Sequence, residues 1–125
     1  MTAPAADAVR AALLAGVRAR ALGLPEVVET VTWGCPTFRA GKRPFAVFLS
    51  DDAHEAALVV VPDADEREAL TQDDRFSVPP FFGAHGALAL DLTAAPVDWD
   101  EVGELLDASY RRVALVRMVR ALDRD

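Results

Sequence analysis

The sequence contains no isoleucine and no asparagine, only one cysteine and only one lysine. These scarcities bear on disulfide bonding, on the cellular compartment and on the base composition of the genome. Because the single cysteine, Cys35, has no second cysteine to pair with, an internal disulfide is excluded and a reducing compartment is favoured. Arginine supplies twelve of the thirteen basic residues. Avoidance of AT-rich codons explains the missing isoleucine and asparagine and the scarce lysine together, so a GC-rich genome accounts for the arginines without any role in phosphate recognition.

Long apolar runs are absent as well. The chain begins with an alanine- and arginine-rich segment, but no positive charge precedes Arg10, and the uninterrupted apolar run before Arg18 extends only from Ala11 to Val17. That composition makes a poor signal peptide. No segment approaches the ~20 apolar residues that a membrane-spanning helix needs. The sequence therefore predicts a cytoplasmic protein with no membrane association.

The length of 125 residues, with 52% hydrophobic and 26% charged residues, is typical of one soluble globular domain over residues 1–125. The net charge of −7 is unevenly distributed along this domain. Residues 1–45 carry six basic and three acidic groups, residues 46–107 carry two and fifteen, and residues 108–125 carry five and two. The two ends are therefore basic and the middle is acidic, and a basic surface would form if the ends meet in the fold.

The order of the predicted elements indicates an α+β protein. Apolar residues at helical spacing predict a first helix over residues 5–23 and one long last helix over residues 98–122. β-branched and aromatic residues predict strands over residues 27–33, 37–40, 44–50, 55–61 and 86–92. Residues 63–72 read as a short acidic helix, and the proline-broken segment 76–82 is expected at a sheet edge or in a loop. We therefore expect an antiparallel sheet with the terminal helices on one face and the short acidic helix inserted mid-chain.

Acidic residues at two predicted helix starts support this assignment. Asp63 is followed by Glu66 and Asp98 by Glu101, each at the spacing of a capping box. In the last helix the acidic residues lie early and the arginines late, which matches the helix dipole. In the segment 86–92, Leu88, Leu90 and Leu92 fall on one face and Ala89 and Asp91 on the other, so it is predicted to be a half-buried strand.

The segment "WGCPTFRAGKRPFAVF" predicts two tight changes of direction. Gly34 and Pro36 are expected to set the first bend, and a hairpin turn is expected at Gly41-Lys42. Trp33 and Phe38 are expected to pack in the interior. The cysteine between them is then interpreted as a small residue that fits beside the two rings.

Three segments, in this order, resemble the MmcQ/YjbR family of small bacterial proteins. They are "WGCPTFRAGKRPFAVF", "DADEREAL" and "VDWDEVGELLDASYRRVA", the last with a Leu-x-Asp-x-Ser-Tyr signature from Leu105 to Tyr110. The resemblance spans nearly the whole chain and implies a CyaY-like fold, in which the terminal helices lie side by side on one face of an antiparallel sheet. It also implies a DNA-binding role, the function for which the family is labelled.

One segment departs from the family pattern. Many members have a tryptophan, often near a lysine, just before the last strand, whereas this chain reads "FFGAHGALAL". His85 is similar in position to a family histidine, but Gly83, Gly86 and Ala87 supply neither the aromatic ring nor the cation. A binding role carried by that corner in relatives is therefore not predicted for this chain.

The residues favour no catalytic or metal site. Cys35 lacks a recognisable base partner, since His54 and His85 are the only histidines and neither lies in a nucleophile motif. One cysteine and two isolated histidines do not give zinc spacing, and the acidic segment 63–68 lacks a calcium-loop pattern. There is also no glycine-rich phosphate loop and no nucleophile elbow. We therefore expect a non-enzymatic protein without a metal or cofactor.

Six cations form the candidate nucleic-acid site, three at the tip of the opening hairpin and three at helical spacing in the last helix: Arg39, Lys42, Arg43, Arg117, Arg120 and Arg124. Trp33 and Phe38 are expected beside the hairpin tip, where aromatic rings could stack on unpaired bases. If the terminal helices pack together, Arg10 or Arg18 would extend the basic face. Neutralisation of phosphates by such a face would supply affinity for DNA.

A second function stays open. The acidic middle of the chain would repel a phosphate backbone, and the last helix carries more apolar residues than one sheet face needs, among them Leu115, Met118 and Leu122. These features favour a non-catalytic domain that binds a protein, a second copy of the chain or a small ligand. The exposed sheet or the last helix would supply the binding surface.

Overall fold

The computed structural model describes residues 4–51, 54–79 and 86–124, and these form four helices and six strands. The helices are α1 (Pro4–Ala21), α2 (Ala64–Leu70), α3 (Trp99–Val113) and α4 (Val116–Asp123). The strands are β1 (Val27–Thr32), β2 (Cys35–Ala40), β3 (Arg43–Leu49), β4 (Ala57–Val60), β5 (Phe76–Ser77) and β6 (Leu88–Asp91). The predicted order of elements agrees with this arrangement except at the last helix.

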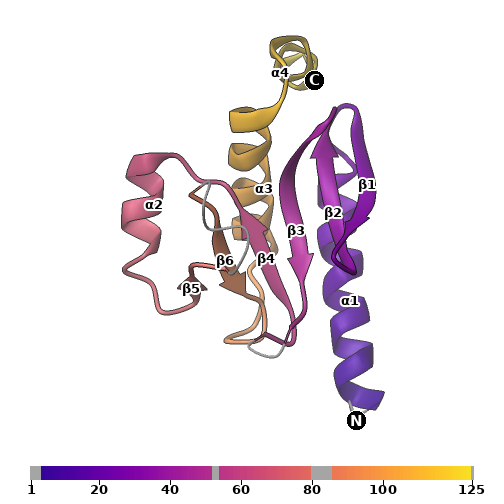
Figure 1. Ribbon diagram of the computed structural model, residues 1–125, viewed down its shortest axis with the longest axis vertical. Helices are drawn as coiled ribbons and strands as arrows, with labels where there is room; N and C mark the ends of the chain where they lie inside the picture. The colour runs from indigo at the N-terminus through magenta and orange to yellow at the C-terminus, as the bar shows by residue number, and fades with distance from the viewer. Residues whose placement is uncertain (1–3, 52–53, 80–85, 125) are drawn as a thin grey trace.

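The strands form one sheet in the order β1-β2-β3-β4-β6-β5, with every neighbouring pair antiparallel. Helices α1 and α3 contact each other behind this sheet, while α2 lies on the side of β5 and β6 (Figure 1). Helices from the first and last parts of the chain are thus neighbours on one face of an antiparallel sheet. The predicted α+β architecture is confirmed.

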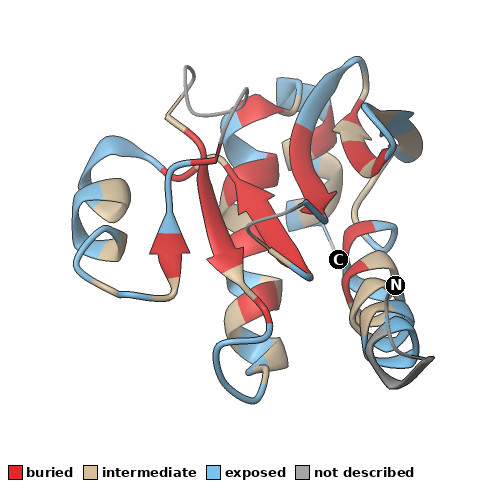
Figure 2. Cartoon of the chain, turned by 60° about the horizontal axis from the view of Figure 1, so that its bottom comes forward, coloured by how far each residue is buried: buried red, intermediate tan, exposed pale blue. Residues whose placement is uncertain are grey.

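The main core lies between the sheet and the two long helices. Its buried side chains come from α1, α3 and the central strands, and they include Val17, Ala21, Phe38, Phe45, Leu58, Leu88, Leu106 and Tyr110. A second, smaller cluster of buried side chains lies on the opposite face of the strands and consists of Cys35, Val47, Leu49, Ala57, Val59, Ala87 and Ala89. The middle of the sheet is therefore buried on both faces (Figure 2). For β6, which the alternation predicted to be half-buried, this means that Ala89 is fully enclosed.

The opening hairpin follows the predicted turns but differs in detail. Trp33 and Gly34 form a two-residue turn in which both have positive φ, 49° and 77°, the left-handed conformation of a type I′ hairpin. Pro36 lies within β2, opposite Val31, so it does not set the bend. Phe38 is fully buried as predicted, but Trp33 is 71% exposed. The prediction that Trp33 packs was wrong, because the central residues of such a turn project beyond the strand ends.

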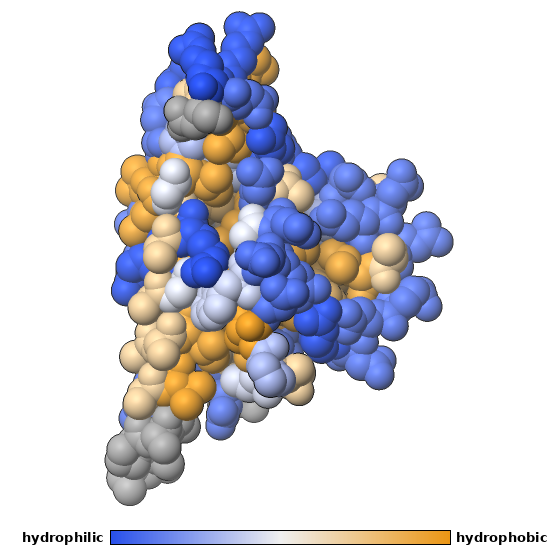
Figure 3. All heavy atoms as spheres, turned by 180° about the vertical axis from the view of Figure 1, so that it is seen from behind, coloured by the Kyte–Doolittle hydropathy of each residue, from blue (hydrophilic) through white to orange (hydrophobic). Residues whose placement is uncertain are grey.

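The prediction of one long last helix was also wrong, since the chain divides it into α3 and α4. Ala114 and Leu115 have extended backbones, with φ/ψ of −68°/153° and −67°/153°, and they turn α4 over the β2–β3 hairpin (Figure 1). This turn buries Met118, whose Cε lies 3.0 Å from the position that a Cβ on Gly41 would occupy. A continuous helix would carry Met118 away from the hairpin, so burial outweighs the helical preference of this segment. Seen from behind, hydrophilic side chains predominate at the α4 end of the molecule, with some hydrophobic ones among them (Figure 3).

Tyr110 of α3 connects this helix to the segment that leads into β1. Its ring packs edge-to-face on Phe45, with 5.5 Å between the ring centroids, and its hydroxyl donates a 2.7 Å hydrogen bond to the Pro25 carbonyl oxygen. Burial raises the pKa of the Tyr110 hydroxyl, and the nearby Glu26 carboxylate raises it further. The folded protein therefore holds this proton more tightly than the unfolded chain does.

Stability should consequently decrease at alkaline pH. Because the pKa of Tyr110 is higher in the folded state, its contribution is constant below the ordinary value of 10.0 and declines as the pH rises through that value towards the folded one. Urea unfolding across this pH range should show a smaller decrease in the free energy of unfolding for Tyr110→Phe than for the wild type. Tyr110 is the only tyrosine, so its absorbance titration reports the pKa directly, and a titration at the ordinary value would contradict the expectation.

Candidate nucleic-acid interface

Most described arginines are engaged by other groups of the protein. Arg18 makes a bidentate pair with Glu29, at 2.7 and 2.9 Å, and this hydrogen-bonded pair lowers the pKa of the Glu29 carboxyl. Arg75 bridges Asp73 and Glu101, with N–O distances of 2.7 Å to each. Guanidinium groups held in this way are neutralised by their own carboxylates and are not available to a ligand.

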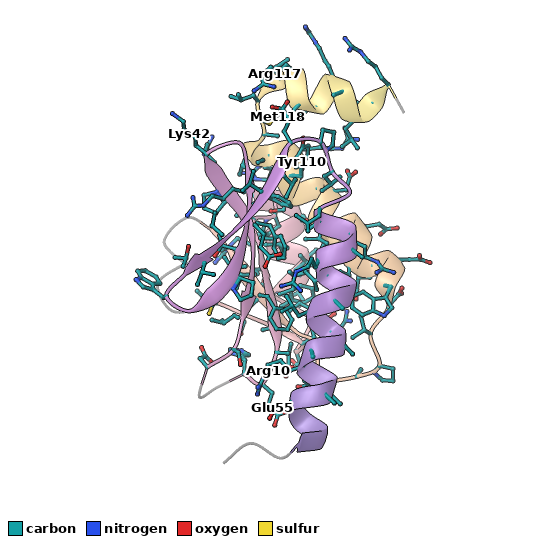
Figure 4. All side chains as sticks on the ribbon, turned by 90° about the vertical axis from the view of Figure 1, so that its right-hand side faces the viewer. Arg10, Lys42, Glu55, Tyr110, Arg117 and Met118 are labelled. Atoms are coloured by element: carbon teal, nitrogen blue, oxygen red, sulfur yellow. The ribbon has the colours of Figure 1, made fainter. Side chains whose placement is uncertain are left out.

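The first helix does not extend the basic face as predicted. Arg10 donates a 3.0 Å hydrogen bond to the Glu55 carbonyl oxygen, and Arg18 is occupied by its carboxylate partner. Arg10 and Glu55 lie at the opposite end of the molecule from Lys42 and Arg117 (Figure 4). The cations of α1 therefore do not join those of the last helix.

Two of the six predicted site residues have structural roles. Arg39 donates to Thr30 Oγ1 and to the Lys42 carbonyl oxygen, each at 3.0 Å, and so fastens β1 to the β2–β3 turn. Arg117 forms an ion pair with Glu26, in the segment before β1. Both guanidinium groups have partners within the fold.

The side chains of the other four predicted cations, and that of a fifth that the sequence did not single out, make no hydrogen bond or ion pair with any described residue: Lys42, Arg43, Arg112, Arg120 and Arg124. All five are exposed. We call them the α4-end cations, because the β2–β3 turn, the end of α3 and α4 share one end of the molecule (Figure 1). Arg112 was missed because it is adjacent to Arg111 in the sequence, and only the pairing of Arg111 with Asp107 and Asp123 distinguishes the two.

The acidic groups at the start of α3 lie away from these cations. Asp100 and Glu101 are in its first turn and Arg111 and Arg112 in its last, and the helix runs towards α4 (Figure 1). Asp100 and Arg111, like Glu101 and Arg112, are eleven residues apart, which at 1.5 Å per residue is ~16 Å along the helix. That separation exceeds the ~8–10 Å over which physiological salt screens exposed charges, so the acidic start of α3 does not cancel the basic end.

The predicted aromatic neighbours are not beside the α4-end cations. Trp33 lies in the β1–β2 turn, at the opposite end of β2 from Lys42, and Phe38 is enclosed in the core. Exposed apolar residues at the α4 end include Leu115 and Val116, at 54% and 67% exposure. Base stacking on the hairpin rings is therefore not available at this site.

Within the described residues, no group of three His, Cys, Asp or Glu side chains could hold a metal ion. Cys35 is a buried packing residue, as predicted, but it packs in the second cluster and not beside the two rings, since Phe38 belongs to the main core and Trp33 is exposed. His54 pairs with Asp51 at 3.1 Å. His85 and the rest of the "FFGAH" segment lie outside the described residues. Each helix of the described chain is too short or too polar to cross a membrane.

Comparison with known proteins connects this geometry to a family. A family model described as YjbR matches residues 22–112. The chain therefore belongs to the YjbR family. The crystal structure of Deinococcus radiodurans protein DR2400, whose domain is described as DUF419, is similar with a TM-score of 0.69 and 20% sequence identity, over 88% of this chain and 87% of that chain. That similarity shows a shared fold, and no curated protein matches the chain.

The YjbR match confirms the resemblance that the three sequence segments predicted. In this chain the Leu105–Tyr110 signature supports the fold: Leu105 and Tyr110 are buried in the main core, and Asp107 pairs with Arg111 at 2.6 Å. Ser109 is buried and bonds to the backbone of Phe45 in β3 and of Val61, directly after β4. The signature therefore marks how α3 attaches to the sheet, and the α4-end cations lie outside it.

Proposed function

We propose that this YjbR-family protein binds DNA through the phosphate backbone at its α4 end. The distribution of unpaired cations supports the proposal most: the α4-end cations have no described partner, whereas every other described arginine donates a hydrogen bond within the protein. A paired arginine must give up its partner before it can bind a phosphate. An unpaired cation displaces only water and counterions.

The chemistry of the five residues fits this ligand. Four are arginines, whose planar guanidinium groups match phosphate oxygens bidentately. They come from the β2–β3 turn, α3 and α4, so their positive charge is spread over a surface and not along one helix. Because the hairpin aromatics are not beside them, we expect binding that depends on phosphate charge and not on base identity. The net charge of −7 predicts modest affinity that decreases steeply with salt.

A matched pair of variants tests the site. Arg120→Gln/Arg124→Gln removes two α4-end cations, whereas Arg10→Gln/Arg20→Gln removes two α1 arginines that are engaged with the Glu55 carbonyl oxygen and the Trp99 ring. Both variants change the net charge equally, so they separate position from total charge. At low salt, the affinity for a fluorescent DNA duplex should decrease about tenfold or more in the first variant and much less in the second.

The two possible failures have different meanings. Equal losses in both variants would show that total charge, and not the α4 end, controls binding. Unchanged affinity in Arg120→Gln/Arg124→Gln would reject this surface. Thermal unfolding of both variants beside the wild type checks that any loss of affinity does not come from loss of the fold.

A further inference from the structure

A cavity of about 450 Å³ lies where β3 and β4 separate beside the C-terminal end of α3. Its wall is formed in part by four aliphatic side chains, those of Val47, Val59, Val61 and Ala87, and its lining includes two of the α4-end cations, Arg43 and Arg112. The volume is within the range of about 300–1,000 Å³ that is typical of small-molecule sites.

Ser109 bridges two residues that line this cavity, Phe45 and Val61. Ala46 is paired with Val60 in the β3–β4 ladder, so Phe45 and Val61 would form the next rung. Instead, the Ser109 hydroxyl accepts a 2.9 Å hydrogen bond from the Val61 N–H and donates one to the Phe45 carbonyl oxygen. The hydroxyl thus takes the place of a direct bond between the strands. Because a buried residue of α3 makes this separation, the cavity is part of the fold.

The lining has two chemically distinct parts. Val47, Val59 and Ala87 belong to the second apolar cluster and, with the partly exposed Val61, form the aliphatic part of the lining, so this part suits an apolar group. Arg43 and Arg112 are exposed and have no partner among the described residues. The described lining contains no carboxylate that could neutralise them. The cavity is therefore complementary to a molecule with an apolar body and an anionic head.

We propose that this cavity binds a small organic carboxylate. The apolar body packs on the valine and alanine wall, and Arg43 and Arg112 donate charge-assisted hydrogen bonds to the carboxylate. The two arginines supply orientation, and the aliphatic wall supplies most of the apolar burial. This ligand is different from DNA, and its binding does not depend on the proposed function.

Titration of isotope-labelled protein with octanoate and with 3-phenylpropionate, followed by NMR, tests the proposal. Both carboxylates should produce saturable shifts at the ends of β3 and β4 and at the end of α3. Octanol, which has the same chain as octanoate without the charge, should bind at least about tenfold more weakly, since it cannot accept charge-assisted hydrogen bonds from the two arginines. Saturation by neither carboxylate, or equal binding of octanoate and octanol, would overturn the proposal.

Three variants locate the site. Arg112→Gln should weaken octanoate binding about tenfold, and Val61→Phe, which places a larger ring in the wall, should abolish it. Arg120→Gln removes a cation outside the lining and should leave octanoate binding unchanged. Far-UV circular dichroism and thermal unfolding verify that each variant is folded. Unchanged octanoate binding in a folded Val61→Phe variant would also overturn the proposal.

The same variants separate this proposal from DNA binding. Arg120→Gln/Arg124→Gln should reduce DNA affinity and retain octanoate binding, whereas Val61→Phe should retain DNA affinity and lose octanoate binding. If no assay detects DNA binding, the octanoate titration still tests the carboxylate proposal. If octanoate does not bind, the DNA assays still test the proposed function.

Discussion

Replacement of Met118 by alanine should release α4 from the hairpin and lower the free energy of unfolding by about 2–5 kcal/mol, the range for truncation of a buried methionine. Met118 is 1% exposed and is the buried residue of α4. An isolated helix of eight residues is not stable in water, and α4 has no side-chain cap at its first turn. Its position therefore depends mainly on Met118, beside the partly buried Leu122 and the exposed ion pairs of Arg117 with Glu26 and Arg111 with Asp123.

Two measurements check this expectation. Urea unfolding gives the loss of stability, and hydrogen exchange should show that the α4 amides lose protection first. Val116→Ala is the matched control, because Val116 is on the same helix and 67% exposed, so its truncation should change stability little. Met118→Ala should also weaken DNA binding, since α4 carries Arg120 and Arg124. Full protection of the α4 amides in Met118→Ala would contradict the role of Met118 as the anchor.

Replacement of Ser109 by alanine should destabilise the protein by about 1–3 kcal/mol, the cost of leaving a buried backbone group without its hydrogen-bond partner. Ser109 is 1% exposed and is the only group that bridges the Val61 N–H and the Phe45 carbonyl oxygen in the described structure. Alanine has no hydroxyl to make either bond. The β3 and β4 ends would then have to approach each other or admit water.

Ser50→Ala provides the control for this substitution. Ser50 is exposed and its hydroxyl donates a single hydrogen bond to the Glu55 carbonyl oxygen, a group that water can reach. Denaturant unfolding should therefore show a much smaller loss of stability for Ser50→Ala than for Ser109→Ala. Equal losses in the two variants would mean that the bridge between the strands does not stabilise the fold.

Much of the fold could be predicted from the sequence because local signals agreed with tertiary packing. The acidic caps at Asp63 and Asp98 both accept hydrogen bonds from the first turn of their helices, and the three family segments identified the architecture. The break at Ala114 and Leu115 could not be predicted, because neither residue stops a helix. It depends on Met118 reaching the β2–β3 turn, which is a contact between distant parts of the chain.

The candidate site was less predictable for a similar reason. Spacing placed Arg117, Arg120 and Arg124 on one helix, but only the fold shows that Arg117 is paired with Glu26 and that Arg112 joins the unpaired cations. Which arginine finds a carboxylate is decided by residues far away in the sequence. The sequence also gives no indication that Arg39 bonds to the Lys42 carbonyl oxygen in the β2–β3 turn.

The salt dependence of DNA affinity tests most directly whether the α4-end cations neutralise phosphates. Each neutralised phosphate contributes about −0.9 to the slope of log affinity against log salt concentration for duplex DNA. With five such cations, we expect a wild-type slope of about −3 to −5 and a slope shallower by about 2 in Arg120→Gln/Arg124→Gln. A wild-type slope near zero, or the same slope in both proteins, would contradict the proposed interface.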